Sequence, residues 1–439
     1  MPRFLSLLLA GAMTLSACTG DGVATSARSA ADTVDPADGG TSAPAADAAE
    51  CDPDGVTITT AHISVGDSAV ETAAAVLEER YPGLAVESGL SSAQGYDQLT
   101  QQVVADLAAG REIDVVQSGN SQVRFYVDTY KPQPIDVSRL RDSYDQRFLG
   151  VGTVEGEVYM APFQVSIPAL YYNRTMMADA GLDPESPPAT YSELFAAAGA
   201  LADISSAGSI YVITAGAADW IAQSAVESAG GRLIADDGTA AFDTPEGREG
   251  LALYAEPAAN GWMDPVGIAE GQAAFITGAT PLFISSPAGA AAVAAEVGDA
   301  FEWGLVPMPI PDGGAPSYPA GGNGWLILTD DPCQAAFASE LIAEMLDPAI
   351  LAESLRTSSY VPVDEEARRR LLEDPTISPQ QRVIYSYEGP VTPWGGWRGN
   401  SAPAANQILT DMVQQLANGV AVETAVAEAV AAIDEIVPR

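Results

Sequence analysis

Hydrophobic residues recur with two different spacings in the first part of the folded chain. The stretch 55–65 alternates and is rich in β-branched residues, which predicts a strand, and 84–88 predicts a second strand. Between and after them, 68–83 and 92–110 show the three-to-four-residue spacing of helices. With a third strand at 113–119, the order strand, helix, strand, helix, strand predicts an α/β domain with a largely parallel sheet.

The middle and the end of the chain show the same α/β pattern of strands and helices. An extended stretch at 156–173 precedes a helix at 190–203, and Ser286 followed by Pro287 is a strong helix-start signal. A strand entered through glycines is expected at 319–331, and the chain beyond it is predominantly helical in pattern. The folded part is longer than a single hydrophobic core usually supports, so we expect two domains.

The first residues have the pattern of an export signal. Arg3 is followed by an apolar run over 4–15, which is too short to span a bilayer as a permanent helix. Small residues then lead into Cys18, and "LSAC" resembles the lipobox of bacterial lipoproteins, in which the cysteine receives a diacylglycerol. We therefore expect a lipoprotein signal peptide at 1–17 and an extracytoplasmic protein anchored to the cell membrane by Cys18. An ordinary secretion signal beside a cysteine is the alternative.

The composition after Cys18 changes abruptly. Residues 18–50 are mainly Ala, Asp, Gly, Ser, Thr and Pro, with few large apolar side chains, so they bury too little surface to offset their ordering entropy. We expect a flexible tether that ends near Cys51. Cys51 and Cys333 remain after lipidation, and because exported proteins meet an oxidising environment we expect a disulfide between them. Two separate buried thiols are the alternative.

The charge balance excludes several classes of function. With 19 basic and 59 acidic residues, the formal net charge of −40 argues against binding to nucleic acid. His62 is the single histidine and lies in a predicted strand, which favours a structural role over catalysis. The sequence lacks the clustered His and Cys ligands of a transition-metal site and the glycine-rich loop of a nucleotide enzyme, so we expect neither metal nor cofactor. The basic run 368–370 is read as a solvated helix face.

Four segments carry a resemblance to a known family. They are "GEVYMAPFQVSIPALYYNRTMMADAGLDPESPPATYSELFAAA", "FEWGLVPMPIPDGG", "PAGGNGWLIL" and "TSSYVPVDEEA". In this order they resemble the extracellular solute-binding proteins, family 1, of bacterial ABC importers, which include maltose- and glycerol-3-phosphate-binding proteins. The resemblance covers most of the folded chain. It implies a two-lobed α/β periplasmic-binding-protein-like fold of type II, with a ligand cleft between hinge-linked lobes.

The resemblance also implies where the chain passes between the lobes. Crossings are expected near 164–166, 284–286 and 320–323, which are extended and rich in Gly, Ser or Pro. The expected N-terminal lobe therefore comprises 51–165 with 284–320, and the C-terminal lobe comprises 166–283 with 321–439.

The candidate binding residues are polar, aromatic or glycine positions at the crossings and at element ends. They are Tyr96, Gln117, Gln164, Ser166, Trp220, Ser285, Ser286, Gly322, Asn323, Tyr360, Trp394, Trp397 and Arg398. Ordinary surface polarity is the alternative for Tyr96 and Gln117, and helix packing is the alternative for Trp220.

The loop "VTPWGGWRGN" at 391–400 is a candidate ligand contact, because two tryptophans and an arginine lie together among glycines. An indole packs on the C–H face of a sugar ring, and a guanidinium is a planar fork of donors that suits a phosphate. "WRGN" resembles the loop of the glycerol-3-phosphate and glycerophosphodiester branch in which an arginine meets the phosphate, with a spacing that departs by one residue. Both ligand classes stay open here, as does a packing role for the tryptophans and a surface ion pair for Arg398.

These expectations favour a monomeric receptor that captures a sugar or a glycerophosphoester and delivers it to the permease of an ABC importer. The first alternative is an exported carbohydrate-active enzyme with a carboxylate pair, and further alternatives are a receptor for neutral oligosaccharides alone and a purely structural lipoprotein. We expect no enzymatic activity.

We predict that Cys18→Ala moves the protein from the membrane fraction to the soluble fraction, because the acyl chains would supply the anchorage. Fractionation of expressing cells followed by immunoblotting measures this. Cys333→Ala, which leaves the lipobox intact, should stay with the membrane. Retention of the Cys18→Ala protein in the membrane fraction would show that the anchor lies elsewhere.

Overall fold

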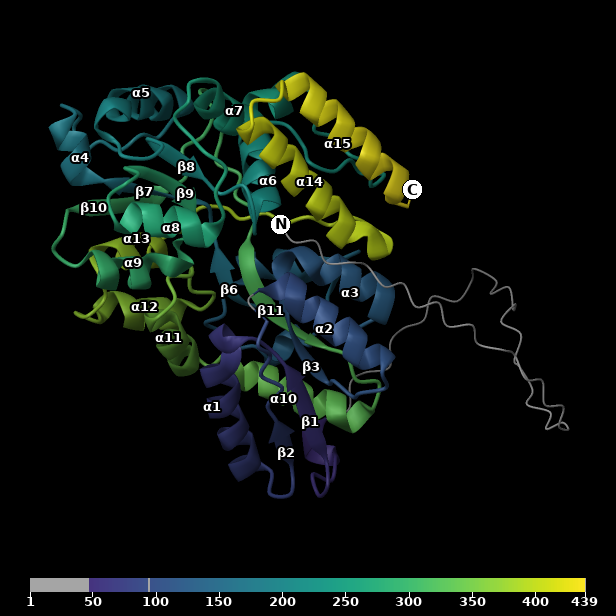
Figure 1. Cartoon of the computed structure of the whole chain (residues 1–439). Coiled ribbons are helices and arrows are strands. Elements are labelled where there is room, and N and C mark those ends of the chain that lie inside the picture. The colour runs from purple at the N-terminus through teal and green to yellow at the C-terminus, as the bar shows by residue number, and fades with distance from the viewer. Residues whose placement is uncertain (1–46, 94, 439) are drawn as a thin grey trace, which may run out of the picture. The chain divides into compact units, whose positions relative to one another are not determined.

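The computed structural model describes residues 47–93 and 95–438 of the chain, and these residues form one compact unit (Figure 1). The expected signal peptide, the expected lipidation site Cys18 and most of the expected tether lie outside the described residues. The tether was expected to extend to residue 50, yet a short 3-10 helix at Ala48–Glu50 already belongs to the folded unit. Its Ala48 side chain is buried and contributes to the hydrophobic core.

The folded unit contains two larger sheets. The first sheet has the order β2-β1-β3-β11-β6 and the second has the order β10-β7-β9-β8. The strands of the first sheet are β1 (Thr57–Ala61), β2 (Ala85–Glu87), β3 (Val115–Gly119), β6 (Ala161–Ser166) and β11 (Gly321–Ile327). Those of the second are β7 (Ala169–Asn173), β8 (Ile210–Val212), β9 (Leu282–Ser285) and β10 (Trp303–Pro307), and a small hairpin joins β4 (Thr153–Val154) to β5 (Glu157–Val158).

The first sheet begins as predicted from the alternating pattern. Strand β1 pairs in parallel with β2 and β3, and the connecting helices have the predicted places. The helices associated with this part of the chain are α1 (Ser64–Arg80), α2 (Tyr96–Ala108), α3 (Val123–Tyr130), α10 (Pro332–Met345) and α11 (Pro348–Arg356). Helix α1 packs against α10 and α11, so segments far apart in sequence share one core.

The remaining helices follow or accompany the second sheet. They are α4 (Arg174–Asp179), α5 (Tyr191–Leu201), α6 (Ala218–Ser228), α7 (Pro245–Ala259), α8 (Ile268–Ile276), α9 (Ala290–Val297), α12 (Glu365–Glu373), α13 (Pro379–Tyr385), α14 (Ala402–Ala417) and α15 (Val422–Ile436). Thr190, the first residue of the helix predicted at 190–203, caps α5 through a full capping box with Glu193. Helix α14 packs on α6, α7 and α15, which brings the end of the chain back to the second sheet's helices. No helix among the described residues is long and apolar enough to cross a bilayer.

The strand pairing corrects the expected division into lobes. Strands β9 and β10 both pair with β7, so 284–320 does not belong with the first sheet. Strand β11 pairs antiparallel with β3 and β6, so 321–327 does not belong with the second. The expected crossing at 284–286 is therefore wrong, because the chain returns through α9 to the same sheet. In Figure 1, β6 and β11 run between the two groups of elements.

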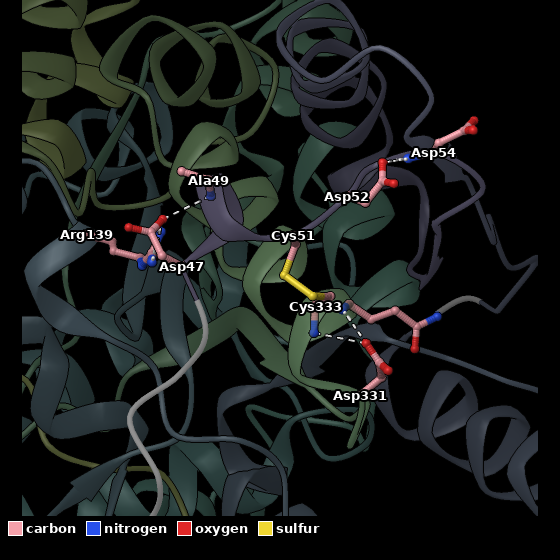
Figure 2. Close-up of a disulfide and its surroundings, with 9 residues drawn as sticks. Asp47, Ala49, Cys51, Asp52, Asp54, Arg139, Asp331 and Cys333 are labelled. Carbon is pink, nitrogen blue, oxygen red and sulfur yellow. Dashed lines mark hydrogen bonds and ion pairs between the residues drawn. A yellow bond between two sulfur atoms is a disulfide. The ribbon is translucent and has the colours of Figure 1, made fainter.

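A disulfide joins Cys51 to Cys333, as expected from the sequence, with their Cα atoms 5.6 Å apart across a sequence separation of 282. Cys51 ends the 3-10 helix, and Cys333 lies in the first turn of α10 (Figure 2). The Asp331 carboxylate caps α10 by accepting from the Cys333 and Gln334 amides, both at 2.9 Å. The start of the folded unit is thus fastened covalently to a helix from the last third of the chain.

We predict that Cys333→Ser lowers the free energy of unfolding by about 4 kcal/mol, because the disulfide restricts a very long loop of the unfolded chain. Denaturant titration of the exported protein measures the loss. Reducing the wild-type protein should produce the same decrease, whereas the reductant should leave Cys333→Ser unchanged. Peptide mapping of the untreated wild type that finds both thiols free would contradict the pairing.

Candidate ligand-binding site

A cavity of about 480 Å³ lies between β6 and β11 of the first sheet and the helices and loops that accompany the second sheet. This volume is in the range in which proteins bind small molecules. Its lining residues are Ile63, Val65, Gly95, Tyr96, Asp97, Gln98, Ser121, Ser166, Gly216, Ala217, Trp220, Ile268, Gln272, Ser286, Ala288, Gly289, Gly321, Gly322, Tyr360 and Trp394. Seven of the thirteen residues proposed from the sequence are in this lining: Tyr96, Ser166, Trp220, Ser286, Gly322, Tyr360 and Trp394.

Two tryptophans form the aromatic wall of the cavity. The rings of Trp220 and Trp394 have centroids 6.0 Å apart and are tilted by 44°. The Trp220 Nε1 donates to the Pro319 carbonyl at 2.6 Å, and the Trp394 Nε1 donates to Asp219 Oδ2 at 2.9 Å. Because both indole nitrogens are already bonded to the protein, the rings are held in place. Trp220 is 1% exposed and Trp394 is half-buried, so Trp394 presents most of the apolar surface of this wall. Trp220 therefore both packs within its helix layer and lines the cavity.

Helix α6 holds the loop that carries Trp394. Gln223 donates to the Pro393 carbonyl at 3.0 Å and accepts from the Gly395 amide at 2.9 Å. Glu227, one turn further along α6, accepts from Gln223 at 2.9 Å and from Thr392 at 3.2 Å. Burial raises the pKa of Glu227, and these donors act in the opposite direction. The position of Trp394 thus depends on side chains that lie outside the cavity.

Trp397 and Arg398 do not line the cavity, which corrects the expectation from the sequence. Trp397 is fully buried in the hydrophobic core. Arg398 donates to the backbone carbonyls of Asp236 and Asp237 at 3.3 and 3.2 Å. The backbone turns through left-handed conformations at Gly395 and Gly396, with φ of 70° and 110°, so the side chains that follow Trp394 leave the loop in other directions.

Four further candidates lie behind the cavity surface. Gln117, Gln164, Ser285 and Asn323 are buried and are not among the lining residues. Asn323 donates to the Tyr96 hydroxyl at 2.7 Å and to Gln164 Oε1 at 2.9 Å, and it accepts from Gln117 at 2.9 Å. Three of the four therefore support Tyr96, whereas Ser285 is taken up by the pairing of β9 with β7.

The serines at two of the expected crossings do meet. The hydroxyls of Ser166 and Ser286 are 2.8 Å apart. Ser286 also accepts from the Ala288 amide and so caps the short 3-10 helix Pro287–Gly289 before α9. The helix start predicted at Ser286 is confirmed, and it lies at the cavity.

Two carboxylates at the site were not identified from the sequence. Asp97 lines the cavity, and Asp219 lies behind Trp394 with 5% of its surface exposed. Burial and the neighbouring negative charge of Asp97 raise the pKa of Asp219 to about 7, and burial raises the pKa of Asp97. None of the described lining residues is a lysine, arginine or histidine. His62 is buried and hydrogen-bonds Thr60 and Asp67, which fits the structural role expected for it.

A family model described as bacterial extracellular solute-binding protein matches residues 72–379. The chain belongs to the bacterial extracellular solute-binding proteins. This membership agrees with the two-lobed fold and with a place outside the cytoplasm.

Sequence similarity to individual solute-binding proteins covers about half of this chain or less, whereas structural similarity covers most of it. The sn-glycerol-3-phosphate-binding periplasmic protein UgpB of Yersinia pestis is 27% identical over 223 residues, which are 48% of this chain and 50% of that protein. A binding protein of Brucella abortus is 26% identical over 39% of this chain and 42% of its own length. The chain thus spans about half the length of the curated relatives that it matches.

Solved structures match over most of the folded unit. The cyclic alpha-maltosyl-1,6-maltose binding protein from Arthrobacter globiformis covers 87% of this chain and 98% of its own, with a TM-score of 0.72 and 19% identity. UgpB from Mycobacterium tuberculosis in complex with glycerophosphocholine has the same TM-score and coverage at 20% identity. Those two proteins bind different kinds of ligand, and at such low identity the similarities support the fold of this chain alone.

We predict that the free energy of unfolding of Asp219→Asn exceeds that of wild type by an amount that grows as the pH rises. In the wild type the folded state keeps a proton that the unfolded state releases between about pH 4 and 7, so stability is lost over this window. Asparagine still accepts from Trp394 but does not ionise. The difference in free energy of unfolding should therefore grow with pH and reach at most about 4 kcal/mol.

Denaturant titrations of both proteins at pH 4 to 8 test this, with the exposed Asp203→Asn as the control for loss of one negative charge. A constant difference between Asp219→Asn and wild type over this range would contradict the raised pKa.

Proposed function

We propose that this solute-binding protein is the receptor of an ABC importer for a small uncharged carbohydrate. The observation that carries the proposal is the composition of the cavity surface, with two fixed indoles and a carboxylate but no basic side chain among its described residues. Indole faces pack on the C–H face of a sugar ring, and carboxylates accept hydrogen bonds from its hydroxyls.

The same surface argues against a phosphoester. A phosphate near Asp97 would meet a carboxylate at short range without a cation to offset it. The sequence suggested a phosphate ligand because of Arg398. In the structure the Arg398 guanidinium donates to the Asp236 and Asp237 carbonyls outside the cavity. The start of the helix at Ser286 adds only partial positive charge.

The remaining parts of the proposal concern the cell. We propose that the mature protein is a monomer held at the membrane by lipid on Cys18, which closes over its ligand and then meets the permease subunits. Ligand contacts from both sheets favour closure, because a ligand shifts a conformational equilibrium by its differential affinity for the two states.

We expect a neutral sugar to bind and glycerol-3-phosphate not to bind in calorimetry with maltose, trehalose, glycerol-3-phosphate and glycerophosphocholine. Trp394→Ala should weaken sugar binding about tenfold or more, because it removes a desolvated aromatic face. Arg398→Ala is the matched control from the same loop and should leave the affinity unchanged. Binding of glycerol-3-phosphate that is lost in Arg398→Ala would contradict the proposal.

The same samples separate a receptor from a hydrolase. Chromatography of the bound sugar after long incubation should return it unchanged. Product formation that disappears in Asp97→Asn would instead support the carbohydrate-active enzyme considered from the sequence.

A further inference from the structure

Helix α8 has one face on the second sheet and another face at the cavity. Gly271 and Phe275, four residues apart, are buried, and a Cβ on Gly271 would lie 2.4 Å from the Phe283 ring on β9. Because Gly271 carries no side chain, the helix packs closely on that strand. Ile268 and Gln272, which are also four residues apart, both line the cavity. The packing of α8 on β9 therefore decides that Gln272 reaches the cavity.

The amide group of Gln272 lies against the backbone of Gly289, just before α9. A Cβ on Gly289 would be 2.7 Å from Gln272 Oε1 and 3.4 Å from its Cδ, and Gly289 lines the cavity as well. The backbone of Gly289 has φ of −80° and ψ of −2°, a conformation that any residue adopts. The glycine is therefore not required by the backbone, and its missing side chain leaves the space that the Gln272 amide occupies.

The Gln272 amide is half-buried and has no hydrogen-bond partner in the described part of the chain. Other polar groups of the lining are already bonded to the protein: the Tyr96 hydroxyl accepts from Asn323, and the hydroxyls of Ser166 and Ser286 bond each other. A primary amide has two donor hydrogens and one acceptor oxygen. A ligand in the cavity can satisfy both kinds of group on Gln272.

Asp97 and Gln272 reach the same cavity from helices of different sheets. Asp97 lies on α2, which packs against β3 of the first sheet, whereas Gln272 lies on α8, which packs against β9 of the second. The carboxylate only accepts hydrogen bonds, whereas the amide both donates and accepts. A sugar hydroxyl also donates and accepts, so a sugar can bond to both side chains at once. Such a ligand would favour the closed arrangement of the lobes, because it gains contacts from both.

We propose that Gln272 is a ligand-binding residue whose amide oxygen and nitrogen hydrogen-bond a pair of neighbouring hydroxyl groups of the sugar. Gly289 is the positioning residue that leaves room for the amide. The ligand is thereby narrowed to an uncharged compound with neighbouring hydroxyl groups at this end of the cavity. This inference rests on the proposed function in assuming that a sugar occupies the cavity.

Calorimetry with maltose and trehalose tests the role of the amide. Gln272→Ala should weaken the sugar that binds about 2- to 10-fold for each hydrogen bond lost. Its thermal unfolding should match wild type, because the side chain is half-buried and bonds no other protein group. The matched control is Gln407→Ala, which removes an exposed amide that donates to Asp411 at 2.8 Å and should bind like wild type.

Gly289→Ala tests the position of the amide without removing it. Alanine fits the backbone there, so the fold should be unaffected, but its Cβ must displace the Gln272 amide and weaken the sugar in the same way. In the Gln272→Ala background the same substitution should change the affinity little, because the displaced group is gone. Gly150→Ala is the matched control, since a Cβ there would meet nothing within 4 Å.

The possible failures are distinguishable. If a sugar binds wild type and Gln272→Ala equally well, the role of Gln272 is wrong while the receptor stands. If the losses of Gln272→Ala and Gly289→Ala add fully, Gly289 does not act through the amide. If neither sugar binds wild type, the proposed function is wrong and the role of Gln272 falls with it. A crystal structure of the ligand-free protein tests the placement by itself: we expect the amide against Gly289, and an amide bonded to another protein group would overturn the proposal.

Discussion

The antiparallel pairing of β11 with both β3 and β6 is the constraint on which the site depends. It inserts 321–327 into a sheet whose other members come from the first part of the chain. The pairing requires glycines: a Cβ on Gly322 would lie 2.1 Å from the Gln164 carbonyl oxygen, and one on Gly321 would lie 2.8 Å from the Trp220 ring. The missing side chains let the strand pass close to β6 and let Trp220 reach the cavity.

The placement of β11 explains why a strongly polar cluster can be buried. Asn323 enters the sheet between Gln117 and Gln164, and the three amides find their donors and acceptors in one another, in the backbone and in the hydroxyls of Tyr96 and Ser354. Buried amides are costly when unpaired but rigid when fully paired. The aromatic side of the cavity is built differently, because the Trp394 loop is held from outside by Gln223 and Glu227. One wall is therefore fixed by the sheet and the other by a helix.

The sequence allowed the fold class and part of the site to be predicted, because both depend on local patterns. Alternation marked the first parallel strands, and the aromatic residues Tyr96, Trp220, Tyr360 and Trp394 were all found at the cavity. The division of 284–320 and 321–327 between the sheets was wrong, since pairing between strands more than 100 residues apart leaves no local signal. Trp397 and Arg398 were misplaced because the turn at Gly395 and Gly396, and not residue type, decides where each side chain points. Asp97 and Asp219 were missed among 59 acidic residues, although the position of Asp219 beside Trp220 at a helix start was an available signal.

A crystal structure of the protein grown with a mixture of neutral sugars and glycerophosphoesters tests the central claim most directly, because the site selects its own ligand. The account predicts a sugar in the cavity, with its ring against Trp220 or Trp394 and a hydroxyl donating to Asp97. A phosphoester in the cavity, or any ligand bound at Arg398 in place of the cavity, would contradict it.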